Sequence, residues 1–347
     1  MKILNKTISL HNKPFIIAEM SNNHLCNKEL AFKMIEVAAK CGVDAIKIQT
    51  YTADSLTIDC DKDDFIIKSP LWKGQSYYDL YKKIAMPISW TKSLFAKAKE
   101  HNIILFSSPF DEDSVALLEE LNCPAYKVAS FEVQDFTLLK AIAKTGKPVI
   151  LSSGISNFEE IKQSIEFLKA HGSNEVAVLH CTSSYPASFE QMNLNALVKL
   201  KELNVVLGLS DHSLSNIPAI ASIAMGGRII EKHFILDRNL DGPDAAFSIE
   251  PDELTSLVIS CNNTWDALGC AKILAKKLRP GKEHGRSIYI IKDVKQGDLV
   301  CPENIRVIRP GFGLSPTYYD SVIGQKFTRD LSRGTALSTE HLNGDHN

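Results

Sequence analysis

The chain has 347 residues, and its 39 Lys and Arg residues nearly balance its 41 Asp and Glu residues, which leaves a formal charge of −2. That balance excludes the strongly basic surface expected of a nucleic-acid-binding protein or of one held on an anionic membrane. With 44% hydrophobic and 23% charged residues, the chain has the composition of a globular protein, which excludes collagen, coiled coil and disorder as descriptions of the whole.

The cysteines and the apolar segments indicate the compartment. The eight cysteines form no C-x-x-C pair, and a chain of this length can build a core without disulfides. The first residues lack the apolar stretch and the cleavage site of a signal peptide. The longest apolar stretch, 217–225, is far short of the ~20 residues that cross a bilayer. We therefore expect a cytoplasmic protein.

Short apolar runs alternate with amphipathic segments along most of the chain. The runs do not alternate internally, which is typical of strands covered on both faces in a parallel sheet. Eight such β-then-α units favour a closed (β/α)8 barrel over an open doubly wound sheet, which uses the same local units. The predicted strands are 15–18, 45–48, 103–106, 125–128, 149–151, 176–179, 205–209 and 228–230. The predicted helices are 28–41, 90–101, 112–121, 135–144, 157–170, 192–203, 214–225 and 251–276.

The residue pattern changes after the last predicted helix. Short β-like runs at 287–291 and 305–308 are separated by Gly and Pro turns. We predict a barrel over 1–277, a linker over 278–285 and a small β-rich domain over 286–347.

Residues 51–87 form an insertion after the second predicted strand, and they include Trp72, Tyr77 and Tyr78. Loops at the carboxyl ends of barrel strands build the active site, so the insertion is predicted to be a substrate lid.

Polar residues follow nearly every predicted strand, and in a barrel these strand ends converge on one mouth. Lys47 and Lys127 are embedded in apolar runs, where a solvated lysine is uncommon. Together with nearby hydroxyls they would cradle a phosphate or a carboxylate. Any single serine is explained equally well as an ordinary strand end. The candidate hydroxyls are those of Ser108, Ser130, Ser152 and Ser210.

His212 and His233 follow adjacent predicted strands. Two imidazoles could share a divalent metal and leave positions open for substrate oxygens. Spacing alone favours hydrogen-bonded core histidines, because no H-E-x-x-H pattern is present. Glu19 ends the first strand and Asp244 lies in a Gly-Pro turn after the eighth. Either carboxylate can act on a substrate. The structural alternative is an ion pair with a lysine for Glu19 and an ordinary Asx turn for Asp244.

Ten motifs in order over nearly the whole chain resemble the sialic acid synthase family of phosphoenolpyruvate-condensing transferases. The resemblance implies a (β/α)8 barrel followed by a C-terminal domain similar to type III antifreeze protein, also called a SAF domain. The motifs are FIIAEMSNNH (15–24), DAIKIQTY (44–51), LFSSPFD (105–111), YKVAS (126–130), ILSSG (150–154), LHCTSSYP (179–186), GLSDHS (208–213), EKHF (231–234), DGPD (241–244) and RPGFGLSP (309–316).

Three segments resemble the branch of this family that acts on 2,4-diacetamido-2,4,6-trideoxy-L-altrose. They are AEMSNNH (18–24), LWKGQSYYDLY (71–81) and GPDAAFSIEP (242–251), the last of which usually reads GPDHKASLEP elsewhere in the family. CTSSYP (181–186) departs from the CTNxYP of sialic acid synthases, so Ser183 lacks the amide that contacts their substrate. N-acetylneuraminate or legionaminate synthesis is the alternative within the family. A carbohydrate-binding module on a degenerate barrel is the non-enzymatic alternative.

The resemblance implies that phosphoenolpyruvate, the open-chain sugar and water give a nine-carbon nonulosonic acid and phosphate. Mn²⁺, Mg²⁺ or Co²⁺ on His212 and His233 would polarise the sugar aldehyde. Lys47, Lys127 and the serines would hold phosphate and carboxylate. The implied residues that contact the sugar or orient water are Glu19, Glu132 and Asp244, and further substrate contacts are Ser183 and Tyr185.

The insertion and one loop are expected to set the choice of sugar. Aromatic and methyl contacts would cover the 6-methyl and 4-acetamido groups, which offer few hydrogen bonds. The expected residues are Trp72, Tyr77, Tyr78, Ala245, Ala246 and Phe247.

The resemblance also implies a homodimer in which each C-terminal domain caps the partner's active site and supplies an arginine to it. The matching residue is Arg309, whose flanking Pro310 and Gly311 fix a tight loop. A guanidinium suits the acetamido carbonyl of the sugar because it donates several hydrogen bonds from a planar fork.

Overall fold

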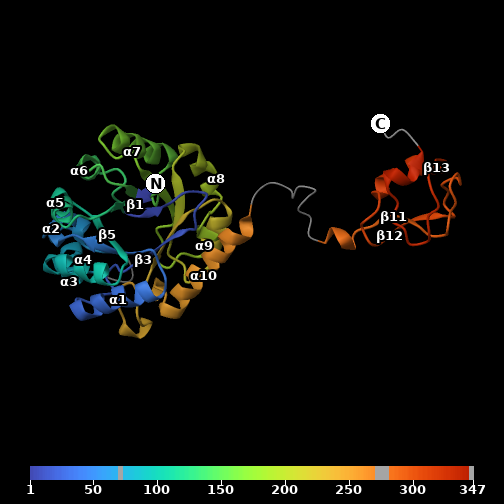
Figure 1. Cartoon of the computed structure of the whole chain (residues 1–347). Coiled ribbons are helices and arrows are strands. Elements are labelled where there is room, and N and C mark those ends of the chain that lie inside the picture. The colour runs from blue at the N-terminus through green and yellow to red at the C-terminus, as the bar shows by residue number, and fades with distance from the viewer. Residues whose placement is uncertain (69–72, 270–280, 344–347) are drawn as a thin grey trace. The chain divides into compact units, whose positions relative to one another are not determined.

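The structure, a computed structural model, describes residues 1–68, 73–269 and 281–343 (Figure 1). The chain forms two units, Met1–Gly269 and Cys270–Asn347, which are described separately below. The predicted boundary at residue 277 stays a prediction, because most of the segment between the units, and Trp72 as well, lies outside the described residues.

The first unit is the predicted (β/α)8 barrel. Within the described residues, eight parallel strands close in the order β10-β3-β4-β5-β6-β7-β8-β9. A short hairpin, β1 (Lys2–Ile3) with β2 (Lys6–Thr7), precedes them. The barrel strands are β3 (Phe15–Glu19), β4 (Ala45–Thr50), β5 (Ile104–Pro109), β6 (Tyr126–Val128), β7 (Val149–Ser152), β8 (Val176–Cys181), β9 (Val206–Asp211) and β10 (Ile229–His233).

Most strands extend further at their carboxyl ends than predicted. The predictions ended where the apolar runs ended, but β5 continues through Ser107 and Ser108, and β9 continues through Ser210. Polar residues remain in a buried strand when neighbouring strands satisfy their hydrogen bonds. The hydroxyls of Ser107 and Thr50, for example, lie 2.7 Å apart. The strand ends are therefore part of the barrel itself and not of its loops.

Helices surround the strands (Figure 1). Side chains of Asn27, Asp111, Asp135 and Asn157 accept hydrogen bonds from the first backbone N–H groups of the helices that follow them, which stabilises those helix starts. The helix predicted over 192–203 is shorter because Asn193 has a φ of +40° and the segment ends in a 3-10 turn. The helices are α1 (Lys28–Lys40), α4 (Thr91–Glu100), α5 (Glu112–Glu120), α6 (Phe136–Lys144), α7 (Phe158–Ala170), α8 (Ala196–Leu200), α9 (Ile217–Ala224) and α10 (Pro251–Leu268).

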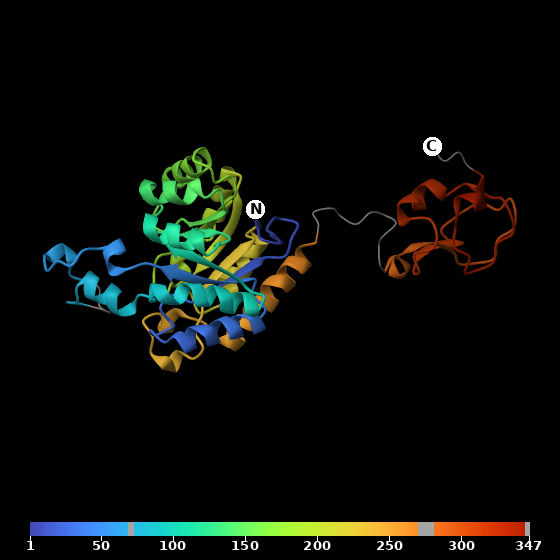
Figure 2. The ribbon, with the colours of Figure 1, turned by 60° about the vertical axis from the view of Figure 1, so that its left-hand side comes forward.

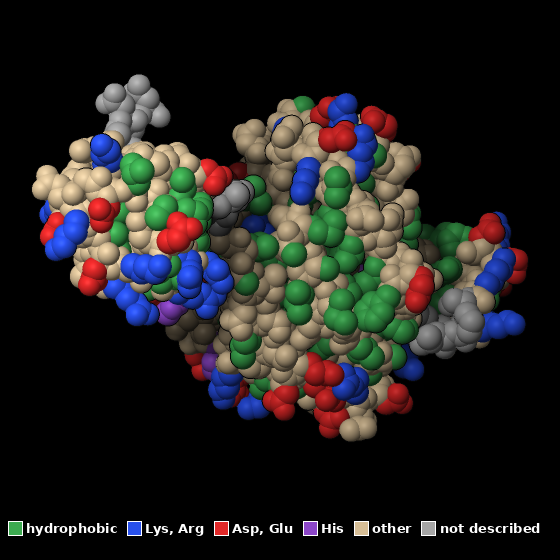
Figure 3. Space-filling view, turned by 90° about the vertical axis from the view of Figure 1, so that its right-hand side faces the viewer, with side chains coloured by type: hydrophobic (Ala, Val, Ile, Leu, Met, Phe, Trp, Pro, Cys, Tyr) green, Lys and Arg blue, Asp and Glu red, His purple; other side chains and the backbone are tan. Residues whose placement is uncertain are grey.

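The core lies between the strands and the helices. One cluster joins Ile46 of β4 to Met34 and Ile35 of α1, and another joins Val149 of β7 to Ile142 of α6. Burying each of these side chains contributes about 1.5–3 kcal/mol. Figure 3 shows one side of the barrel, where apolar side chains also reach the surface among charged groups. Among the described residues, no helix has the length and apolar character that crossing a membrane requires.

The insertion after β4 carries α2 (Ala53–Leu56) and α3 (Tyr77–Ile84). Figure 2 shows this segment extending beyond the carboxyl ends of the barrel strands. The two helices pack against each other, and a bridge between Ile66 and Ser76 closes the intervening segment.

The second unit is small and β-rich, as predicted. β11 (Ser287–Ile290) pairs antiparallel with β12 (Ile305–Ile308), and β13 (Lys326–Phe327) pairs antiparallel with β14 (Leu342–Asn343). Its own core includes the buried side chains Ile288, Ile290, Val300, Ile305, Phe327 and Leu337.

Candidate active site

The strand-end residues surround a cavity of about 220 Å³ at the mouth of the barrel. Side chains from strands all around the barrel and from the insertion line it. The predicted residues among them are Glu19, Lys47, Lys127, Ser130, Glu132, Ser152, Tyr185, Ser210, His212 and His233.

Two buried lysines form the centre of this cavity. Lys47 Nζ lies 2.8 Å from Glu19 Oε2 and donates to Ser108 Oγ at 3.2 Å. Lys127 Nζ donates to Ser152 Oγ at 2.7 Å and to the carbonyl of Val128 at 3.1 Å. An ammonium has three donors, so Lys127 keeps one for a substrate anion.

Glu231 faces the same two lysines, and sequence reasoning missed it as a site residue. Its Oε1 lies 3.8 Å from each lysine Nζ and accepts from Ser210 Oγ at 3.2 Å. Strand geometry could have indicated it, because residues two apart in a strand share a face and Glu231 precedes His233 by two. Gln49, whose Nε2 donates to Glu19 Oε1 at 3.0 Å, was missed in the same way.

The charges of this cluster favour an anion. Burial, together with the Glu231 charge, raises the pKa of Glu19 to about 7 although Lys47 opposes the shift. Burial also opposes ionisation of Glu231, but Lys127 and Lys47 hold its pKa below the usual value. Burial lowers the pKa of Lys127, and the charge of Glu231 opposes that lowering. Near neutral pH, the two lysines face one full carboxylate, that of Glu231, and one carboxyl group, that of Glu19, which is partly protonated. The lysines therefore outnumber the fully ionised carboxylates that face them.

The two histidines lie side by side, with ring centroids 5.3 Å apart. Burial lowers the pKa of both imidazoles, which keeps them neutral. His212 Nδ1 lies 2.9 Å from the carbonyl of Thr182, so it carries the proton and leaves the Nε2 lone pair free. His233 Nδ1 is buried with no hydrogen-bond partner.

Neutral imidazoles with unused nitrogens are the donors that a divalent transition metal prefers, so the residues present fit such an ion. In the part of the chain that the structure describes, no cluster of three or more His, Cys, Asp or Glu side chains is arranged to hold a metal. A metal on this pair would therefore take its other ligands from water or substrate.

Aromatic and acidic residues close the histidine side of the cavity. The ring of Tyr185 lies 4.3 Å from that of His212 and 5.0 Å from that of Phe247, which also packs on His233 at 4.9 Å. Asp244 is buried, and its Oδ2 accepts from the backbone N–H of Asn22 at 3.2 Å. Burial raises the pKa of Asp244.

Ser130 and Ser183 contact each other at the opposite rim, with their Oγ atoms 3.0 Å apart. Gly154 approaches them so closely that a Cβ atom there would lie 2.0 Å from Ser130 Cβ and 2.9 Å from Ser183 Oγ. Its φ of +39° also favours glycine. Gly154 therefore makes room for this pair of hydroxyls.

Two tyrosines of the segment 51–87 line the cavity, Tyr51 and Tyr81, and neither is among the predicted ones. Tyr81 lines the cavity together with Leu56 and Ile84, and Tyr77 stacks on Tyr81 at 6.0 Å. Tyr78 instead lies 3.5 Å from Asp54 at the surface. Ala245 and Ala246 line a neighbouring hollow beside Asn22 and Leu80.

Arg309 belongs to the second unit, where it is exposed and directly follows β12. Its loop is fixed, because the Gly311 N–H donates to the carbonyl of Glu283 at 3.1 Å and Ser287 Oγ donates to that of Pro310 at 2.8 Å.

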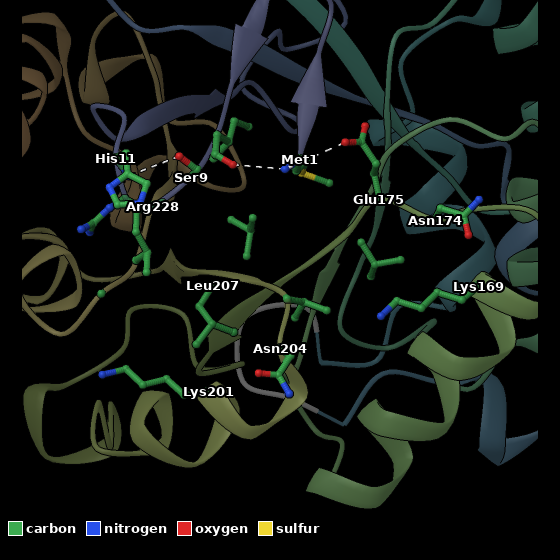
Figure 4. Close-up of a pocket in the computed structure, with 16 residues that line it drawn as sticks. Met1, Ser9, His11, Lys169, Asn174, Glu175, Lys201, Asn204, Leu207 and Arg228 are labelled. Atoms are coloured by element: carbon green, nitrogen blue, oxygen red, sulfur yellow. Dashed lines mark hydrogen bonds and ion pairs between the residues drawn. The ribbon is translucent and has the colours of Figure 1, made fainter.

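A larger cavity, of about 830 Å³, lies at the other end of the barrel (Figure 4). It is lined near the amino ends of β8, β9 and β10 by apolar side chains such as Leu207, with Lys169 and Lys201 around them. Arg228 donates there to the carbonyls of Ile223 and Gly227. Barrel enzymes carry their chemistry at the carboxyl ends, so the smaller cavity is the candidate active site.

A (β/α)8 barrel with buried cations, carboxylates and paired histidines at its mouth is an enzyme scaffold for a small anionic substrate. The chain belongs to the NeuB family, whose sequence profile matches residues 34–273, and the SAF domain profile matches residues 285–343. The family and fold expected from the motifs are confirmed.

Relatives cover nearly the whole chain. Pseudaminic acid synthase of Campylobacter jejuni is 43% identical over 94% of this chain and 95% of its own. Pseudaminic acid synthase of Helicobacter pylori is 38% identical over 95% and 98%. The solved N-acetylneuraminic acid synthetase of Leptospira borgpetersenii is 32% identical with a TM-score of 0.72, covering 80% of this chain and 92% of its own.

Proposed function

We propose that this chain is a pseudaminic acid synthase. It condenses phosphoenolpyruvate with 2,4-diacetamido-2,4,6-trideoxy-L-altrose and water to give pseudaminic acid and phosphate. The higher identity to two pseudaminic acid synthases, 43% and 38%, than to a neuraminic acid synthetase, 32%, supports this choice of sugar. The observation that carries the chemistry is the pair of buried lysines beside two neutral histidines.

Lys47 and Lys127 bind the phosphate and carboxylate of phosphoenolpyruvate. The two lysine side chains stabilise the anion, and exclusion of water strengthens each interaction. Ser108 and Ser152 hold the two ammonium groups in place. Glu231 Oε1 lies 3.8 Å from both lysine Nζ atoms and partly balances their charge when no substrate is bound.

His212 and His233 would hold a divalent metal, of which Mn²⁺, Mg²⁺ and Co²⁺ are candidates. Bound there, the metal would supply Lewis-acid polarisation of the sugar aldehyde. The Thr182 carbonyl keeps the proton of His212 on Nδ1 and so would leave Nε2 free for the ion. Tyr185 and Phe247 cover the histidines and exclude bulk water.

Three carboxyl groups are placed for proton transfer to water and sugar. Glu19 has a pKa of about 7, raised by burial, which suits a group that accepts and returns a proton near neutral pH. Burial also raises the pKa of Glu132 to about 7. Asp244 Oδ2 lies 3.9 Å from His233 Nδ1, and burial raises the pKa of this carboxyl group as well.

The enzyme works in the cytoplasm as a homodimer, in which the C-terminal domain of each chain caps the partner's active site with Arg309. The SAF match over residues 285–343 and the fixed, exposed loop of Arg309 support this arrangement. Substrate contacts from Ser130, Ser183, Ser210, Tyr185, Tyr77 and Trp72 complete the proposed site.

A sugar panel tests the proposal. Phosphate release from phosphoenolpyruvate is measured with Mn²⁺ and either the altro-configured diacetamido sugar, its legionaminic-type isomer or N-acetylmannosamine. The altro sugar is expected to give the highest kcat/KM. Equal or faster turnover of either other sugar would overturn the pseudaminic assignment, and no phosphate release with any sugar would overturn the enzymatic one.

A further inference from the structure

A buried ion pair lies immediately behind the two histidines. Lys232 Nζ is 2.6 Å from Asp211 Oδ2, and both side chains are 0% exposed. Asp211 precedes His212 and Lys232 precedes His233 in the chain. Successive residues of a strand point to opposite faces. The pair therefore lies on the helix side of β9 and β10, while Ser210, Glu231 and the histidines line the cavity.

The pair also occupies the last position at which β9 and β10 are joined. Their register runs from Ile229 opposite Gly208 to Lys232 opposite Asp211, and it stops there. No β-ladder pairing links the two strands at His212 and His233. The ion pair is thus the last direct connection between the strands before the residues that would hold the metal.

Further bonds extend this connection into the loop after β9. Asp211 Oδ1 accepts from the backbone N–H of Ser213 at 2.9 Å. Lys232 Nζ donates to the carbonyl of Ser215 at 3.0 Å. The backbone on both sides of His212 is therefore held to β10 by these two side chains.

The two histidines are held in different ways. The His212 ring has its own bond to the Thr182 carbonyl, whereas His233 Nδ1 has no hydrogen-bond partner. The His233 backbone is in register with Glu19 of β3, so the ion pair holds it only on the β9 side. The His233 ring packs against Phe247, and its Nδ1 lies 3.9 Å from Asp244 Oδ2.

We propose that Asp211 and Lys232 form a clamp that sets the spacing of the His212 and His233 imidazoles and so determines the affinity for the metal. Both are positioning residues, since neither side chain lines the cavity. The inference rests on the metal site of the proposed function. The clamp can be distinguished from a purely stabilising role. An apolar pair of similar volume often replaces a buried ion pair with little loss of stability, so such a variant can lose the clamp and stay folded.

The decisive variant is therefore Asp211→Leu with Lys232→Met, which removes the clamp and leaves no buried charge. Mn²⁺ binding to the metal-free full-length protein is measured by titration with electron paramagnetic resonance detection, and the unfolding midpoint is measured on the same samples. Mutating a residue that supports a metal ligand typically lowers the metal affinity 10–100-fold. We expect Mn²⁺ affinity to fall about tenfold or more while the variant stays folded.

A second variant and a control keep the test decisive. Asp211→Asn keeps the size of the side chain and one acceptor for Lys232, and it is expected to weaken Mn²⁺ binding by about threefold, below the full effect of removing a metal-ligand support. The control, Glu119→Gln with Lys147→Met, removes a pair whose atoms are 2.5 Å apart elsewhere on the barrel, and should leave the affinity unchanged.

Folded Asp211 variants that bind Mn²⁺ as tightly as the wild type would overturn the clamp while leaving the metal site standing. A wild-type protein that binds no Mn²⁺ would reject the proposed metal site and the clamp with it. Phosphate release by such a protein would still leave the condensation reaction in place.

Discussion

Glu231 Oε1 lies 3.8 Å from Lys127 Nζ, close enough for strong attraction inside the barrel but beyond hydrogen-bond distance. The ammonium therefore keeps a donor for substrate while its charge is partly balanced. In this arrangement, the Glu231 carboxylate stabilises the charge of Lys127 without using its free N–H donor.

Replacing this lysine by an apolar residue of similar length should remove the anion site. Lys127→Met is expected to lower kcat/KM for phosphoenolpyruvate by about a hundredfold or more, because a preorganised cation is lost from a dry cavity. Steady-state phosphate release measures the effect. Lys140→Met, at an exposed position of α6, is the control and should behave as wild type. An unchanged kcat/KM in Lys127→Met would refute the assigned role.

The two histidines should act together in binding the metal. A chelator-treated protein is expected to be inactive and to recover with Mn²⁺, Mg²⁺ or Co²⁺, whereas the His212→Ala, His233→Ala double variant should neither bind Mn²⁺ nor recover. Calorimetric titration with Mn²⁺ measures binding apart from activity. Full activity of metal-free wild-type protein contradicts the prediction.

Glu132 should make the stability depend on pH. Burial raises its pKa in the folded protein from 4.5 to about 7, so the folded state holds this proton where the unfolded state has already released it. The free energy of unfolding is therefore expected to fall as pH rises from 4.5 to 7.

Glu132→Gln removes this contribution. The free energy of unfolding of the variant, relative to that of wild type, should rise by about 1–2 kcal/mol from pH 4.5 to pH 8. This value is reduced for the partial exposure of the side chain. Urea unfolding at both pH values measures it, and Glu166→Gln, at an exposed position of α7, is the control. A gain no larger than that of the control would show that Glu132 ionises normally.

The loop after β10 should discriminate between sugars. Ala246→Lys introduces a long charged side chain into the hollow beside the site, where the apolar groups of the diacetamido sugar are expected. We expect kcat/KM for that sugar to fall about tenfold, in line with losing 1–3 kcal/mol of apolar contact. Ala170→Lys, exposed at the end of α7, is the matched control. Equal losses for both variants would remove this loop from the specificity site.

Subunit mixing tests whether Arg309 acts across a dimer. Arg309→Ala and His233→Ala chains are each expected to be inactive alone. A heterodimer has one site with an intact barrel and an intact arginine, so mixing should restore about a quarter of wild-type activity if exchange is random and sites are independent. If activity stays absent after subunit exchange is verified, the cap does not come from the partner.

The sequence was sufficient to predict the barrel because each strand is an apolar run bounded by turn residues, and because eight units of this kind favour closure. It was less informative about where strands end. Ser107, Ser108 and Ser210 look like loop residues until their neighbours are known to satisfy their hydrogen bonds.

The candidate site was predicted where residue type alone is unusual. A lysine inside an apolar run is conspicuous, whereas Glu231 lies in a charged stretch that resembles a solvated strand end. Tyr51 and Tyr81 were missed for another reason, since four tyrosines of the segment 51–87 are equivalent in the sequence and only the fold of the insertion selects these two for the cavity.

Gly154 limits how this enzyme can be redesigned. A Cβ atom at this position would lie 2.0 Å from Ser130 Cβ, so any other residue would drive apart the loops after β6 and β7. Chimeras that exchange these loops with those of related synthases must therefore transfer the segments containing Ser130, Gly154 and Ser183 as one block. Libraries that randomise position 154 alone are expected to return glycine.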